Sequence, residues 1–281
     1  MSSLMAFMVG AGAMAGAVSG IPVEEAMAEY YVAEPADAPF AAYTGKEAEA
    51  ILIGEARKRA FRCNYVQLSV NYGDAVDFQL RQELVVVCPQ TLEFLYSGFT
   101  PLETRYVKGS RPALEKVAAE ATAGCSTARE KALALMRYCR DLYDEKWYTG
   151  AFGEYVYGGT EEELIEKGEI LCECLGRLHV ALCEVSGIPG RLVMHVVGGH
   201  ICSEVHVDGG WAYMDPRCGM YFVKADGTLA SLRDLLNDPG LVRAQPDEVK
   251  ADVGPWWTWE ERAWKCEHKY FRLEEVNGFE N

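Results

Sequence analysis

Three residues in the second half of the chain have the types and the order of the reacting groups of a thiol enzyme. Cys172 comes first, His200 follows it, and Asp215 comes last. In such a centre the thiol attacks a carbonyl carbon and the imidazole takes the thiol proton, while the carboxylate orients the imidazole and stabilises its charged form. We therefore take Cys172, His200 and Asp215 as the candidate nucleophile, base and orienting acid.

A helix is expected to position the thiol. Apolar residues recur at steps of three and four over residues 171–185, which is the periodicity of a helix. Gly187, followed two residues later by Pro189, ends the pattern. Cys172 then lies in the first helical turn. Unpaired backbone N–H groups and the positive end of the helix dipole stabilise a thiolate at that place.

Strands are expected to position the other two groups. The sequence favours three of them, at residues 191–197, 200–207 and 211–214. A hairpin turn over residues 208–210 joins the second strand to the third. This turn would fold Asp215 back beside His200.

The residues around this triad resemble the transglutaminase-like superfamily, a branch of the papain-like thiol enzymes. The resemblance rests on a cysteine ahead of a Gly-Ile-Pro-x-Arg run, followed by a His-x-x-x-Glu-Val strand, a Gly-Trp and an Asp-Pro. The matching residues of this chain are Cys172, Gly176, Gly187, Arg191, His200, Glu204, Trp211 and Asp215. The pattern is specific over residues 160–222 and extends from about residue 107.

This resemblance implies an α+β fold of the papain-like, transglutaminase-core type, in which the nucleophile helix packs on an antiparallel sheet. It also implies the catalytic roles of Cys172, His200 and Asp215. Two positions depart from the family pattern. Ile170 stands where a Gly usually precedes the Cys by two residues, and Cys202 stands where an aromatic residue often follows the His by two.

The expected reaction is attack on an amide or related acyl bond through an acyl-enzyme, in an amidase, a peptidase or an acyltransferase. The substrate would be a small molecule or peptide with such a group, and the chemistry requires no cofactor and no metal. The backbone N–H of Cys172 and a second donor from the loop 147–157 would stabilise the oxyanion. The candidate substrate-binding residues are Trp147, Tyr148, Tyr157 and Glu204. Glu204 has an alternative role, which is to brace its strand or an arginine.

Other residues compete for these roles. Cys174 is the alternative nucleophile, but helix geometry turns it about 160° away from Cys172. His206 shares a strand face with His200 and is the alternative base. The cysteines and histidines of this region could instead hold zinc, although they include no paired C-x-x-C knuckle. A thiol-dependent isomerase or lyase, or a non-catalytic binding module, is the alternative function.

The composition limits the partners and the cell compartment that can be expected for this protein. The chain has 281 residues, 49% of them apolar, which is enough for one sizeable core. Its net charge of −15 argues against nucleic acid and anionic membranes as partners, and it suits cationic or amine-bearing substrates. Ten irregularly spaced cysteines in a chain of this size favour a reducing compartment, so we expect a cytoplasmic protein.

Two regions are expected along the chain. Residues 1–106 form an N-terminal accessory region, and residues 107–281 form the transglutaminase-like catalytic domain with an aromatic C-terminal tail. The accessory region should contain a Gly/Ala-rich arm, a helix at 46–60 and a small β unit at 64–70, 77–88 and 92–96. For 77–87 a helix also fits the pattern.

Further elements are expected within the catalytic domain. Amphipathic helices at 111–123 and 127–143 and a short acidic helix at 160–167, capped by Thr160, should precede the nucleophile helix. Ser231 should cap a later one. The aromatic tail either packs against the sheet or forms part of a cleft wall.

Overall fold

The computed structural model describes residues 84–87, 92, 95–96, 102–104, 106–142, 160–168, 171–195 and 200–271. The strands of its sheet are β1 (Leu84–Val87), β2 (Gly190–His195), β3 (His200–Val207), β4 (Gly210–Asp215) and β5 (Met220–Tyr221). The helices described between β1 and β2 are α5 (Pro112–Ala121), α6 (Ala128–Asp141), α8 (Glu161–Lys167) and α9 (Cys172–Val185). The later ones are α10 (Leu232–Asn237), η4 (Pro239–Val242), α11 (Asp247–Lys250), α12 (Trp259–Lys265) and the π-helical η5 (Cys266–Tyr270).

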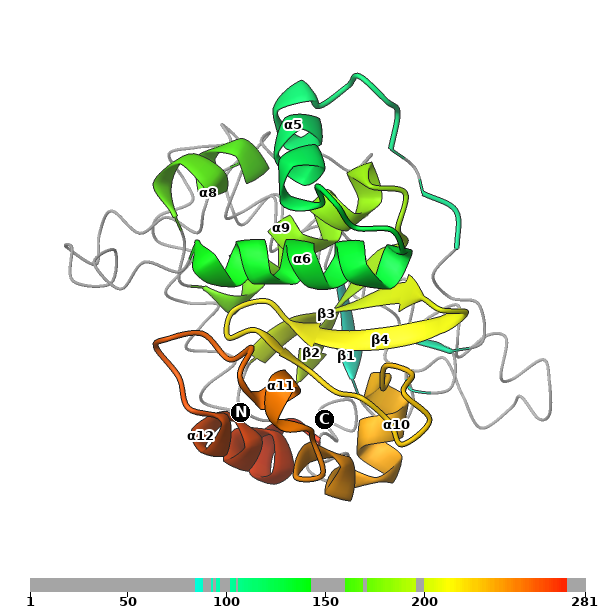
Figure 1. Cartoon of the computed structure of the whole chain (residues 1–281), viewed down its shortest axis with the longest axis vertical. Coiled ribbons are helices and arrows are strands. Elements are labelled where there is room, and N and C mark those ends of the chain that lie inside the picture. The colour runs from blue at the N-terminus through cyan, green and yellow to red at the C-terminus, as the bar shows by residue number, and fades with distance from the viewer. Residues whose placement is uncertain are drawn as a thin grey trace, which may run out of the picture.

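The fold is α+β, with helices on both sides of one sheet (Figure 1). The strands lie in the order β1-β2-β3-β4-β5, and all neighbours are antiparallel except β1 and β2. Helices α5, α6, α8 and α9 lie on one side, and α10, α11 and α12 lie on the other (Figure 1). Among the described residues, no helix is long and apolar enough to cross a lipid bilayer.

Strand β3 contacts both helical layers. Ser203 Oγ lies 2.8 Å from His179 Nδ1 of α9, whereas the neighbouring Glu204 accepts a hydrogen bond from the backbone N–H of Leu232 in α10 (2.8 Å). Because successive side chains of a strand point to opposite faces, each helical layer meets its own set of β3 residues. Every residue of β3 except His206 is buried.

Helix α9 can lie close against the sheet because Gly176 has no side chain. A Cβ atom at this position would come within 3.2 Å of Leu192 Cδ2 and 3.9 Å of the Cys202 backbone. The small residue one turn after Cys172 therefore sets how closely the helix approaches β3. It thereby sets where the thiol lies relative to the sheet.

A two-residue turn fixes the register between β3 and β4. Asp208 and Gly209 form this turn with φ values of 53° and 77°. Two positive φ values are typical of a type I′ hairpin turn, whose twist matches that of the strands. In this register Met214 lies opposite Ser203, so Asp215 returns towards the start of β3.

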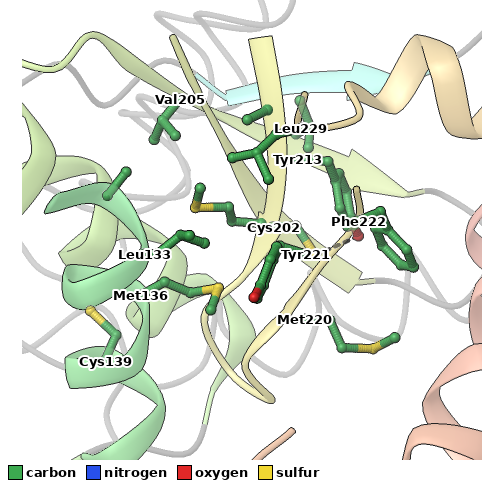
Figure 2. Packing of buried hydrophobic residues seen from close by; sticks show 14 of the residues in the cluster. Leu133, Met136, Cys139, Cys202, Val205, Tyr213, Met220, Tyr221, Phe222 and Leu229 are labelled. Atoms are coloured by element: carbon green, nitrogen blue, oxygen red, sulfur yellow. Dashed lines mark hydrogen bonds between the residues drawn. The ribbon is translucent and has the colours of Figure 1, made fainter. Parts of the chain in front are cut away.

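The core on the α6 side of the sheet is filled with aliphatic, aromatic and sulfur-containing side chains. Figure 2 shows Met136 of α6 directed towards Tyr221 of β5. It also shows the hydrogen bond of 2.9 Å from the Tyr213 hydroxyl to Cys202 Sγ, which ties β4 to β3. These two side chains belong to the opposite face of the sheet, the one that carries Glu204. Their bond gives the buried Tyr213 hydroxyl a partner.

A buried ion pair holds three segments of the chain together. Arg191 of β2 lies opposite Glu204 of β3, and their side chains are fully buried with Nη2 and Oε2 2.6 Å apart. Glu204 also accepts hydrogen bonds from the Tyr96 hydroxyl (2.7 Å) and from the backbone of Leu232. The Arg191 guanidinium lies 3.9 Å from the centroid of the Trp211 ring. The segment before α5, the sheet and α10 therefore share one pair of buried charges.

Most elements expected within the described part of the chain are present. The helices expected from residues 127 and 160 and after Ser231 are confirmed, and each begins with a capping box. The three strands around the hairpin are confirmed as well. The strand expected at 92–96 is wrong at the described positions, because Leu92 and Leu95 are helical and bury side chains three residues apart.

Part of the accessory region joins the sheet of the catalytic elements. The sequence favours a strand at 77–88 or a helix at 77–87. The described part of this segment is a strand, β1, which pairs in parallel with β2. The boundary between residues 106 and 107 stays a prediction. The arm at the start of the chain, the helix at 46–60 and the strand at 64–70 lie outside the described residues.

Replacing Glu204 with Ala should lower the free energy of unfolding by about 3–5 kcal/mol, because Arg191 would stay buried without its partner. Urea unfolding followed by circular dichroism measures this change. Glu267→Ala is the matched control, because it removes a more exposed ion pair with Arg243 and should cost no more than about 1 kcal/mol. Equal losses in the two variants would contradict the role given to the buried pair.

Candidate active site

The three candidate residues lie at the ends of three elements. Cys172 is the first residue of α9, His200 is the first of β3, and Asp215 is the last of β4. The thiol is half-buried, whereas the imidazole and the carboxylate each keep only 2% of their residue surface exposed. The packing of α9 and the hairpin register bring these three ends to one place.

His200 connects the other two side chains. Its Nε2 lies 2.7 Å from Asp215 Oδ2. The Cys172 thiol lies close enough to the His200 side chain and to the Ile201 backbone for both to lower its pKa. Because Asp215 engages Nε2, Nδ1 is the ring nitrogen left to face the thiol. The structure therefore brings together the three residues singled out from the sequence, in the expected order of contact.

Cys172 and His200 favour the charged form of each other. Burial would raise the pKa of the Cys172 thiol, but the charge of His200 and its hydrogen bond outweigh burial and lower that pKa. Burial would likewise lower the pKa of His200, but the carboxylate of Asp215 and the thiolate raise it to about 9. Each group therefore favours the charged form of the other, a thiolate beside an imidazolium.

Asp215 is held as a buried carboxylate by several donors. Arg262 of α12 places Nη2 3.0 Å from Asp215 Oδ2 and 3.3 Å from His200 Nε2. The Cys218 thiol donates to the same oxygen (2.9 Å), and the backbone N–H of Arg217 donates to Oδ1 (3.1 Å). Burial would raise the pKa of Asp215, but His200 and Arg262 hold it well below its usual range.

Aromatic residues of the C-terminal tail pack around the imidazole. Tyr270 of η5 stacks on His200, with ring centroids 4.7 Å apart and planes at 23°. Phe271 is buried against Tyr213, whereas Trp256 and Trp264 are 47% and 48% exposed. The tail thus packs against the sheet, and its buried part restricts the orientation of the base.

The first turn of α9 presents backbone donors beside the thiol. The N-cap residue Leu171 makes no side-chain capping hydrogen bond. The first N–H groups of an α-helix have no partner within the helix, and the helix dipole makes this end positive. Such donors suit a thiolate and the oxyanion that forms when the thiolate attacks a carbonyl.

His200, Cys202 and Asp215 also bring three potential metal ligands within 4.8 Å of one another. Their contacts do not suit a divalent cation, because the positive guanidinium of Arg262 already lies against Asp215 Oδ2. Burial also raises the pKa of Cys202 well above its usual value, and a thiol binds metals as the thiolate. Hydrogen bonding explains this group better than metal ligation.

The competing nucleophile and base lie elsewhere. Cys174 is fully buried in the hydrophobic core beneath α9. His206 is six residues along β3 from His200, or roughly 20 Å at the rise of a strand. Its ring packs edge-on against Trp211, with centroids 5.4 Å apart. Neither residue shares the contacts that join Cys172, His200 and Asp215.

The candidate substrate-binding residues divide into two groups. Trp147, Tyr148 and Tyr157, together with the loop that should give the second oxyanion donor, lie outside the described residues. Glu204 is fully buried in its ion pair with Arg191. A residue buried in this way does not contact a substrate. Glu204 instead has the alternative role expected for it, which is to brace the strand and an arginine.

Several residues at the site were not found from the sequence: Arg262, Cys218, Tyr270 and Arg217. A signal for the first was present, because Trp259, Arg262, Ala263 and Cys266 recur at helical steps on one buried face. An arginine on an apolar helix face needs a buried acidic partner. That partner, Asp215, could not be identified without the fold.

Comparison with known proteins supports the family resemblance. Residues 115–216 match the family model of the transglutaminase-like superfamily. This segment contains the candidate Cys, His and Asp but ends before α12. No curated protein and no solved structure gives a significant match.

Iodoacetamide at pH 6 should label Cys172 ahead of the other cysteines, because His200 lowers the pKa of its thiol. Less than roughly one ordinary thiol in a hundred is ionised at this pH. Peptide mapping by mass spectrometry after a short exposure measures the order of labelling. Cys125 is the internal control, since it is also half-buried. Faster labelling of Cys125 or Cys174 would move the nucleophile away from Cys172.

Asp215→Asn should shift the pH profile of this labelling upwards. In the wild type the ion pair forms above the lowered pKa of Cys172 and is lost as the pH rises through about 9, the pKa of His200. Without the carboxylate the pKa of His200 should fall and that of Cys172 should rise, so labelling at pH 6 should slow by about tenfold or more. Asp252→Asn, which removes the ion pair with Arg137, is the control that should leave the profile unchanged. An unaltered profile in Asp215→Asn would exclude the proposed coupling.

Proposed function

Because the chain carries a transglutaminase-like domain at residues 115–216, we propose that it is a cysteine-dependent hydrolase or acyltransferase acting on an amide or related acyl bond. The proposal rests above all on the contacts from the Cys172 thiol to His200 and from His200 Nε2 to Asp215 Oδ2 (2.7 Å). A thiolate beside an imidazolium supplies both the nucleophile and the proton donor that acyl transfer needs.

In the first half of the reaction the Cys172 thiolate attacks the carbonyl carbon of the substrate. The carbonyl oxygen becomes an oxyanion, which the backbone N–H of Cys172 at the start of α9 stabilises. His200 then donates its proton to the leaving nitrogen or oxygen as the bond to carbon breaks. The products of this half are an acyl-enzyme thioester, a free amine or alcohol, and a neutral imidazole.

In the second half a water molecule or an amine attacks the thioester. Neutral His200 takes a proton from this nucleophile, and the carbon–sulfur bond breaks to restore the thiolate and the imidazolium. Asp215 keeps the imidazole in the tautomer that this exchange needs and stabilises its charged form. Arg262 and Cys218 hold Asp215 in place and ionised.

We favour water as the second nucleophile and therefore hydrolysis of the substrate, because bacterial proteins of similar architecture are often hydrolases. The substrate would be a small molecule or a peptide, with Trp147, Tyr148 and Tyr157 as the proposed contacts. A thiol-dependent isomerase or lyase could use the same Cys172–His200 pair, and a binding module would use neither.

Reaction products decide between these functions. The protein is incubated with panels of peptide amides and esters in H₂¹⁸O, with and without an added primary amine. Hydrolysis places one ¹⁸O atom in the product carboxylate, transfer gives a new amide, and an isomerase or lyase forms neither. Mass spectrometry distinguishes these outcomes.

On any substrate so found, Cys172→Ala and His200→Ala should each lower kcat/KM by about 10³-fold or more, because each removes a group used in both halves of the reaction. His206→Ala should retain most of the activity and serves as the matched control on the same strand. Loss of activity in His206→Ala alone would mean that the base is wrongly assigned. Full activity in all three variants would exclude the thiol mechanism.

A further inference from the structure

Three positively charged side chains surround the indole ring of Trp257. The guanidinium carbons of Arg262 and Arg217 lie 5.1 Å and 5.3 Å from the ring centroid, and Lys265 Nζ lies 5.6 Å from it. These distances are within the range of cation–π attraction. The group is a local concentration of positive charge in a chain whose net charge is −15.

This group adjoins the candidate active site. Arg262 contacts both Asp215 (3.0 Å) and His200 (3.3 Å), as described above. Arg217 follows Asp215 by two residues, and its backbone N–H donates to Asp215 Oδ1. Burial raises the pKa of Cys172, and His200 lowers it most. The charge of Arg217 lowers it further. The positive charges therefore lie close to the reacting groups.

The three cations differ in how their charge is balanced. Arg262 is buried, and Asp215 neutralises it. Arg217 and Lys265 are half-buried, and within the described ranges neither forms an ion pair. Half-buried positive charge that forms no ion pair within those ranges favours the binding of an anion.

The positive charges of this group act on one another, and Lys265 is an example. Burial lowers the pKa of Lys265, and the charges of Arg262, Arg217 and Lys269 lower it further. A negative group placed between Arg217 and Lys265 would relieve this repulsion. The face of Trp257 would at the same time provide apolar contact for the carbon atoms that carry the negative group.

We propose that Arg217 and Lys265, next to Trp257, form an anion-binding subsite that holds a carboxylate of the substrate while its acyl carbon lies at Cys172. The inference rests on the proposed function and adds the charge class of the substrate. The net charge of the chain would instead favour a cationic or amine-bearing substrate.

The test compares iodoacetate with iodoacetamide as probes of Cys172. The two reagents have nearly the same size and the same leaving group, but only iodoacetate is negatively charged. In each case a carbon–sulfur bond forms as the carbon–iodine bond breaks and iodide leaves. The fraction of ionised thiol affects both rates equally, so their ratio isolates the effect of the probe's charge. N-(iodoacetyl)glycine and N-(iodoacetyl)glycinamide form a second pair, with the charge farther from the reacting carbon.

The second-order rate constants are measured at pH 7 by mass spectrometry of the peptide that contains Cys172. For each pair, the rate constant of the anionic reagent is divided by that of the neutral reagent. In at least one pair, this ratio should be roughly tenfold higher for Cys172 than for 2-mercaptoethanol. The ratio should fall by a similar factor in Arg217→Gln and in Lys265→Gln, and it should also fall with added NaCl. Arg243→Gln changes an arginine that is already paired with Glu267, and it should keep the wild-type ratio.

The outcomes separate this inference from the proposed function. A wild-type ratio equal to that of 2-mercaptoethanol in both probe pairs, or one unchanged in both variants, overturns the subsite. If iodoacetamide still prefers Cys172 in that case, the thiol centre stands without it. If iodoacetamide does not prefer Cys172, the proposed function fails and the subsite fails with it. Should Arg217→Gln not fold, as judged by circular dichroism, the ratio in Lys265→Gln alone decides.

Discussion

The buried charge of Asp215 is the interaction on which the rest of the site depends. A carboxylate that is 2% exposed is costly unless positive charge and hydrogen-bond donors surround it. Here His200 and Arg262 supply the charge, and in doing so His200 acquires a pKa of about 9. A histidine that is protonated at neutral pH in turn lowers the pKa of the Cys172 thiol. One buried negative charge thus favours the charged forms of the other two groups, and helix α12, which carries Arg262, becomes part of the candidate site.

The face of the sheet covered by the C-terminal helices holds a second buried charge pair, Arg191 and Glu204, nearer the hairpin end of β3. Glu204 bonds to the start of α10, and Asp215 bonds to α12. The C-terminal segment is therefore attached to the sheet through two sets of charged contacts as well as through aromatic packing. Removing one partner from either set leaves an unpaired buried charge, which is far more costly than losing an exposed ion pair.

The nucleophile helix, the two strands with their hairpin and the three candidate catalytic residues could all be predicted from the sequence, because local signals specify them. The period of α9, the Asp-Gly turn and the capping residues act within a few positions. The contacts of Arg262 and Tyr270 with His200 could not be predicted, since about sixty to seventy residues separate the partners and only the folded chain brings them together.

Leu92 was misassigned for a related reason, because a short apolar run is compatible with either a strand or a helix. Glu204 was given two possible roles, substrate contact or bracing an arginine, because its type and spacing do not reveal that Arg191 is paired with it inside the fold.

The charge near the thiol also shows why overall composition is a poor guide to a binding site. The chain carries 42 acidic and 27 basic residues, yet Arg217, Arg262 and Lys265 gather around Trp257 beside Asp215. Electrostatic interactions weaken over a distance of about 10 Å in salt, so a ligand at Cys172 responds to these neighbours more than to the distant surface. The turn after β4 has two consequences in this arrangement. Its backbone holds the carboxylate that orients the base, and the Arg217 side chain that leaves it adds positive charge near the thiolate. Under the proposed function, Arg217 and Arg262 would thus serve both the ionisation of the candidate catalytic groups and the binding of a negatively charged substrate.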